Sequence, residues 1–159
     1  MGLSYDDKGT IASKGTIQLN LLNELNALSY YKQIPPKSLG REWVEENIIP
    51  LIDKFQYIIP DILRTYTEHI IQQINNSIRE IDTGKILITG GGAHNTFLIS
   101  QLKHITKHSV LIPDIKLIDY REALIFGLLG WLKINYKENI LSTYTGAIRN
   151  SISGIVIDG

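Results

Sequence analysis

The sequence contains no cysteine, so disulfide bonds, thiolate metal sites and cysteine nucleophiles are all excluded. It also lacks an excess of either charge, because sixteen Lys and Arg residues balance sixteen Asp and Glu residues. Without a basic stripe, nucleic acid is not expected as a partner. The N-terminal stretch MGLSYDDKG has no basic-then-apolar signal pattern. It also fits the myristoylation pattern poorly, because the sixth residue, Asp6, is neither Ser nor Thr.

Long apolar runs are absent as well. The longest, ALIFGLLGWL at Ala123–Leu132, is too short to span a bilayer. We therefore expect a cytoplasmic protein with no membrane partner. The 159 residues, of which 43% are hydrophobic, are enough for one ordinary domain with a core.

The apolar spacing predicts helices that alternate with two short strands, at Lys85–Thr89 and Ser109–Pro113. Residues 115–119 are interpreted as an extended connection. The final helix is apolar nearly all round and should be buried. The order indicates an α/β fold with parallel strands and an α-β-α-β-α core at about residues 58–136. Helical spacing marks residues 16–29, 43–54, 60–81, 95–105 and 120–136.

Three consecutive glycines, Gly90–Gly92, separate the first strand from the helix that follows it. Glycine lets a backbone approach a ligand closely, and a helix start offers free N–H groups and a positive dipole end. This combination suits a phosphate or a nucleotide. The alternative is a tight strand-to-helix turn in which Asn95 is an ordinary N-cap. Spacing alone leaves both interpretations open.

The stretch LITGGGAHNTFL resembles the adenosine motif of the sugar-kinase and actin superfamily. Four more segments, KGTIASKG, PPKSLGREW, REALIFGLLGWL and YTGA, resemble the C-terminal half of the anhydro-N-acetylmuramic acid kinases. They occur in the family's order and cover nearly the whole chain. The chain is therefore identified as similar to the C-terminal portion of this family.

The resemblance implies an RNase H-like, actin-like ATPase fold of two domains with the active site in a cleft. It implies a kinase that uses ATP and Mg²⁺ to open and phosphorylate 1,6-anhydro-N-acetylmuramic acid. The product is N-acetylmuramic acid 6-phosphate, made during peptidoglycan recycling in bacteria. Gly90, Gly91, Gly92 and Asn95 match the motif that lines the nucleotide, whereas His94 stands where family chains usually carry Arg.

Family members are considerably longer, and their phosphate-binding glycine motifs and general-base aspartate precede the matched region. The resemblance therefore implies that residues 1–159 are a single C-terminal fragment with an incomplete parallel or mixed sheet. We expect it to hold the ATP-binding side and no catalytic residue, and to be inactive alone. Asp82-Thr83-Gly84 is interpreted as a simple turn and not as a replacement base.

Three further residues are candidates for the substrate or the cleft: Glu122, Ser38 and Arg41. Glu122 lies in a segment that faces the cleft in the family, but Asp119 and Glu122 also form a capping pattern at a helix start. Arg41 has a structural alternative too, an ion pair with Glu45 four residues later. Both alternatives stay open at this stage.

Two pairs of residues are interpreted as structural. His104 and His108 have a metal-like spacing, but we expect surface histidines and no metal site, since a helix should end between them. Gly127 and Gly130 interrupt a helix that should be buried, so we expect close-packing points there.

Two alternatives to the named kinase remain. One is another kinase of the same superfamily. The other is a non-catalytic interaction module that docks through the surface its missing strands would have covered, with a homo-oligomer as one outcome.

Overall fold

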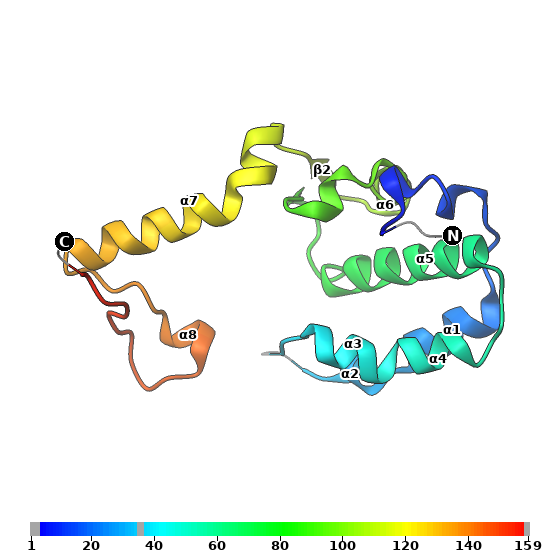
Figure 1. Ribbon diagram of the computed structural model, residues 1–159, viewed down its shortest axis with the longest axis horizontal. Coiled ribbons are helices and arrows are strands. Elements are labelled where there is room, and N and C mark those ends of the chain that lie inside the picture. The colour runs from blue at the N-terminus through cyan, green and yellow to red at the C-terminus, as the bar shows by residue number, and fades with distance from the viewer. Residues whose placement is uncertain (1–3, 35–36, 158–159) are drawn as a thin grey trace. The chain divides into compact units, whose positions relative to one another are not determined.

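The computed structural model describes residues 4–34 and 37–157, and the chain divides into two compact units, Met1–Ile112 and Pro113–Gly159 (Figure 1). Within the described residues the strands are β1 (Lys85–Leu87) and β2 (Ser109–Leu111). The helices are α1 (Leu19–Ala27), α2 (Ser29–Lys32), α3 (Arg41–Asn47), α4 (Ile49–Asp53), α5 (Ile59–Ser77), α6 (Thr96–Ile105), α7 (Ile115–Ile134) and α8 (Ser142–Thr145). Three short 3-10 turns are η1 (Asp7–Gly9), η2 (Ala12–Lys14) and η3 (Gly91–His94). The helix-rich α/β class is confirmed. None of these helices is long and apolar enough to cross a membrane.

The first unit is built around α5, which packs against α1 on one side and α6 on the other (Figure 1). Its hydrophobic core is a cluster of four buried side chains, namely Leu21, Leu25, Ile48 and Leu51. The helix predicted for residues 16–29 is thus confirmed over Leu19–Ala27, and Leu21 and Leu25 of this helix lie in the core. The helix expected over residues 43–54 is two helices. Pro50 opens α4, and a proline has no N–H to continue the preceding helix.

The N-terminus of α5 forms hydrogen bonds with the segment that precedes α1. The Asp61 carboxylate accepts hydrogen bonds from the Thr16 backbone N–H at 2.8 Å and from Gln18 Nε2 at 2.7 Å. A Cβ on Gly15 would clash with the Pro60 carbonyl, so this crossing requires glycine. An acidic residue in the first turn also suits the positive end of the helix.

The two strands pair in parallel, with Ile86 opposite Val110, and α6 forms the crossover between them. Both strands were expected, and both are shorter than the apolar runs that predicted them. Leu87 and Leu111, the last residues of the two strands, remain exposed. Purely parallel sheets are normally covered on both faces, so this sheet is only partly covered by the described chain.

The second unit begins with α7, and here one prediction is wrong. Residues 115–119 are the first turn of the helix and not an extended connection. The Asp114 side chain caps the helix by accepting from the Leu117 backbone N–H at 3.1 Å. Asp114 has an extended backbone, with φ −64° and ψ 157°, which is the conformation that an N-cap needs.

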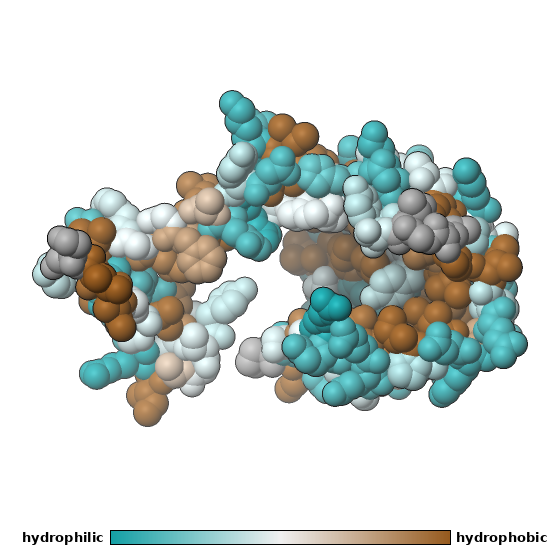
Figure 2. Space-filling view, viewed as in Figure 1, coloured by the Kyte–Doolittle hydropathy of each residue, from teal (hydrophilic) through white to brown (hydrophobic). Residues whose placement is uncertain are grey.

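The burial predicted for α7 is also wrong within this chain. Of its residues only Ile118 is buried, and Phe126 is 69% exposed. A Cβ on Gly127 or Gly130 would meet no atom within 4 Å, so neither glycine is a close-packing point here. Apolar side chains accordingly reach the surface along this unit (Figure 2). The physical reason is that no other described element of Pro113–Gly159 covers most of the helix.

Candidate functional site

The glycine run forms a compact turn between β1 and α6. Gly90 has a φ of 77°, in the region that favours glycine, and its carbonyl accepts the Ala93 N–H at 2.9 Å. The following residues make the single turn η3, in which the Asn95 N–H donates to the Gly92 carbonyl at 3.1 Å. The chain therefore moves from strand to helix without a long loop, as the sequence predicts.

The next two glycines are exposed and uncrowded. A Cβ on Gly91 or Gly92 would meet no atom of the described chain within 4 Å. Neither residue has the positive φ that would itself require glycine. Packing within this chain therefore does not explain why both positions are glycine. The bare backbone here leaves room for a ligand to approach the main chain.

Asn95 is the N-cap of α6, as the interpretation of this stretch as a strand-to-helix turn predicts. Its Oδ1 accepts from the Leu98 N–H at 3.0 Å, and its carbonyl accepts from the Ile99 N–H at 3.0 Å. The oxygen of the side chain is thus turned toward the helix. Within the described contacts, Asn95 fixes the end of the turn to the helix.

The residues after this turn also contact the start of the chain, which the sequence did not predict. Gly9 is buried with a φ of 73°, and a Cβ there would clash with Asn95 Oδ1. Beside it, the Thr96 hydroxyl donates to the Lys8 carbonyl at 3.3 Å. Lys8 and Gly9 begin the segment KGTIASKG, and nothing in that segment indicated this contact.

Ser38 lies between α2 and α3, and Arg41 is the first residue of α3. Pro35 and Pro36 of this segment are outside the described residues. Arg41 Nε pairs with Glu45 Oε1 at 2.7 Å, which confirms the structural alternative for this side chain. Ser38 is exposed. No described contact joins either residue to the glycine turn.

Glu122 lies within α7, in the second unit, and its side chain is 81% exposed. The predicted Asp119–Glu122 cap is wrong, because the helix begins four residues before Asp119 with Asp114 as its cap. The nearest ion-pair partner of Glu122 is the neighbouring Arg121, at 3.9 Å. Its role as a substrate contact stays a prediction.

The two candidate histidines, His104 and His108, differ in burial. His104 is exposed near the end of α6, but His108 is buried, so the expectation of two surface histidines is half wrong. His108 is buried because it stands directly before β2, beside Gly84. Across the described ranges, no group of three His, Cys, Asp or Glu side chains could hold a metal ion. Asp82 and Thr83 form a bend, in line with a plain turn.

Comparisons with known proteins show which family this chain resembles. The family described as anhydro-N-acetylmuramic acid kinase matches residues 1–159. A protein of that name from Sulfurimonas denitrificans is 31% identical, over 99% of this chain and 46% of the relative. One from Francisella tularensis subsp. novicida is 35% identical over 94% of this chain and 42% of the relative. One from Clostridioides difficile is 31% identical, with the same two shares.

The chain thus spans less than half the length of the curated relatives that it matches. The match nevertheless runs through both units and includes the glycine turn at Gly90–Gly92. The chain belongs to the anhydro-N-acetylmuramic acid kinase family and corresponds to its C-terminal portion.

Proposed function

We propose that this chain is the ATP-binding part of a cytoplasmic kinase that opens and phosphorylates 1,6-anhydro-N-acetylmuramic acid to give N-acetylmuramic acid 6-phosphate. The family supports the reaction class, because the relatives are named as kinases of this sugar. The α-β-α-β-α order of α5 to α7, at about residues 58–136, is compatible with an RNase H-like domain to which the rest of a kinase would add strands.

The observation that carries the proposal is the open glycine turn. Gly91 and Gly92 begin the turn η3, which leads through Asn95 into the N-terminus of α6, and no described atom lies near the positions that their Cβ atoms would occupy. Backbone N–H groups and the positive end of a helix dipole stabilise a negatively charged ligand. In this proposal Gly90 sets the turn, Gly91 and Gly92 let the nucleotide contact the backbone, and Asn95 holds the turn onto the helix.

Phosphoryl transfer also needs Mg²⁺ and a base that activates the attacking group. In this proposal Mg²⁺ is supplied as the complex with ATP. We assign no residue of this chain as the base. Its residues bind and orient the nucleotide, and Glu122, Ser38 and Arg41 stay candidates for the cleft. The chain alone is therefore expected to be inactive.

Nucleotide binding provides the direct test. Gly91→Val should weaken the binding of ATP to the 159-residue chain by about tenfold or more, because the new side chain would occupy the space of the ligand. Folding should be unaffected, because that space holds no protein atom. Gly127→Val is the matched control, since it makes the same change at another uncrowded glycine outside the turn. Unchanged ATP affinity in a folded Gly91→Val protein would refute the site.

Activity provides the second test. ADP production from Mg-ATP and 1,6-anhydro-N-acetylmuramic acid would be measured with this chain alone and with a chimaera. The chimaera joins this chain to the preceding portion of the Francisella relative. We expect activity in the chimaera only. Activity of the chain alone would overturn the assignment of the base to another segment, and an inactive but folded chimaera that binds ATP would argue for another substrate.

A further inference from the structure

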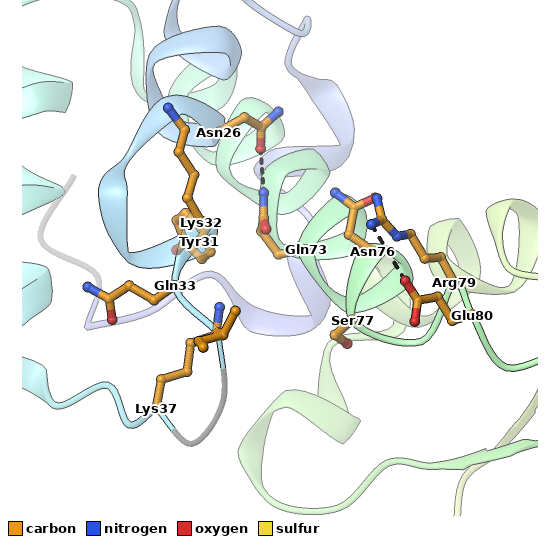
Figure 3. A pocket seen from close by; sticks show the side chains of 11 residues that line it. Asn26, Tyr31, Lys32, Gln33, Lys37, Gln73, Asn76, Ser77, Arg79 and Glu80 are labelled. Carbon is orange, nitrogen blue, oxygen red and sulfur yellow. Dashed lines mark hydrogen bonds and ion pairs between the residues drawn. The ribbon is translucent and has the colours of Figure 1, made fainter.

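A cavity lies in the first unit, between the α1–α2 stretch and the C-terminal end of α5 (Figure 3). Its volume of ≈700 Å³ falls in the range of about 300–1,000 Å³ that small-molecule sites occupy. None of its lining residues belongs to the glycine turn. The proposed nucleotide site therefore does not account for it.

The wall of this cavity is a fixed network of amide groups. Asn26 Oδ1 accepts from Gln73 Nε2 at 2.8 Å, and Asn26 Nδ2 donates to Gln72 Oε1 at 2.8 Å. Asn26 and Gln73 come from α1 and α5, and Figure 3 shows their side chains joined across the wall. Because these groups are already held in place, a ligand that contacts them would not have to order them.

His69 anchors the same network from behind. Its Nδ1 lies 2.7 Å from Asn26 Oδ1, and since that oxygen is an acceptor, Nδ1 is the donor. Only 1% of His69 is exposed, and the ring of Tyr31, which lines the cavity, packs edge-on against it at 4.8 Å. The wall is thus backed by a packed aromatic pair and is not a loose surface depression.

The rim of the cavity is basic. Lys32, Lys37 and Arg79 line it against a single acid, Glu80, which pairs with Arg79 at 3.7 Å. Lys37 is held over the Tyr30 ring, with Nζ 4.9 Å from the ring centroid. Lys32, at the end of α2, makes no described hydrogen bond or ion pair within the chain. Uncompensated positive charge beside preformed amides favours a ligand that is anionic and carries several hydrogen-bonding groups.

We propose that this cavity is a binding site for a small, hydroxyl-bearing anion, the chemistry shared by sugar acids and sugar phosphates. The amides of Asn26 and Gln73 contact the hydroxyl groups, and the basic rim contacts the carboxylate or phosphate. The cavity and the glycine turn share no residue, so the binding test below is separate from the test of the nucleotide site.

The test titrates the 159-residue chain with glucose 6-phosphate and with glucuronate, while NMR follows the side-chain amide signals of Asn26 and Gln73. We expect saturable shifts with at least one of these anions. Binding of only one of them identifies phosphate or carboxylate as the source of the charge. No saturable shift with either would overturn the site. Equal shifts with neutral glucose, or with inorganic phosphate alone, would overturn the assigned ligand class.

Substitutions complete the test. Lys32→Gln should weaken binding by about tenfold, since it removes one charge-assisted contact. Arg79→Gln is a second variant with a side chain that is 72% exposed, so folding does not depend on it. Lys54→Gln, at an exposed lysine outside the cavity, is the matched control and should leave binding unchanged. If Lys54→Gln weakened binding equally, the effect would come from the net charge of the chain and not from a contact in the cavity. That result would refute the site.

Discussion

The two long helices of the molecule, α5 and α7, have nearly the same length and opposite surroundings. The 19 residues of α5 lie between α1 and α6 and include the fully buried Thr65, His69 and Ile71. The 20 residues of α7 are more apolar in sequence, yet only Ile118 is buried. The helix with the stronger tendency to be buried is therefore the one with less cover.

This contrast shows that the apolar sequence of a helix indicates how much of its surface favours burial. Whether that surface is buried depends on which other elements pack against the helix. A helix that is apolar all round is typical of a core position. The relatives are more than twice as long as this chain, so the family contains further chain that could supply such cover. The first unit has its own core, whereas among the described residues of the second unit only Ile118 is buried.

Truncating one leucine in each unit gives the largest expected difference. Leu25→Ala should lower the free energy of unfolding by about 2–5 kcal/mol, because Leu25 is completely buried in the core of the first unit. Leu128→Ala in α7 should change it by less than about 0.5 kcal/mol, since Leu128 is 54% exposed. Urea denaturation followed by circular dichroism measures both. Equal losses would mean that α7 is covered.

Self-association should depend on α7. The exposed apolar side chains of the helix are expected to draw copies of the isolated chain together. Phe126→Glu should then weaken the association by roughly a hundredfold, about 2.7 kcal/mol, as measured by light scattering over a range of concentrations.

The control for this experiment is Ile58→Glu, which places the same charge at an exposed isoleucine of the first unit. It should leave the association unchanged. A wild-type chain that stays a clean monomer at high concentration would contradict the prediction outright.

Acid should destabilise the first unit through His69. Burial lowers the pKa of this imidazole to about 4, below its ordinary value of 6.5, so the unfolded chain binds the proton more readily. The stabilisation is therefore complete above about pH 7 and is lost as the pH falls from 6.5 through 4. The loss should be roughly 1–3 kcal/mol.

The matched pair for this pH effect is His69→Gln and His104→Gln. The first should flatten the dependence of the unfolding free energy between pH 7 and 4, whereas the second changes an exposed histidine and should preserve it. An unchanged slope in His69→Gln would show that another group causes the acid sensitivity.

The smallest expected effect compares two helix caps. Asn95 and Asp114 make the same contact, accepting from the Leu98 and Leu117 N–H groups at 3.0 and 3.1 Å. Asn95→Ala should cost about 1 kcal/mol of the stability of the first unit. Asp114→Ala should cost that unit nothing, because it frays a helix of the other unit. Hydrogen exchange of α6 and α7 amides separates the two effects.

The sequence predicted those features that depend on local patterns. The helical spacing of Leu21, Leu22 and Leu25, the strand at Ile86, and the cap at Asn95 are all confirmed. Each follows from a short-range rule, namely periodicity, β-branching or a side chain that reaches the third N–H of a helix.

Features that depend on distant partners were not predictable. Thr65 and His69 are buried because Gln18 and Asn26, more than forty positions away, donate to or accept from them. The exposure of α7 depends on which elements pack against it, and the sequence of the helix itself does not specify these. The start of α7 was not predicted, because residues 115–119 were interpreted as an extended connection, although Asp114 is a suitable N-cap residue.

The contact of Lys8 and Gly9 with Asn95 and Thr96 has a consequence for biosynthesis. The hydrogen bond between Thr96 and Lys8 joins residues 88 positions apart, whereas Asp61 and Thr16 are only 45 apart. Long loops close late, because their ends must first be brought together against chain entropy. On a ribosome, α1 to α5 can assemble first. The turn at Gly90–Gly92 would receive its support only after Thr96 has emerged from the exit tunnel.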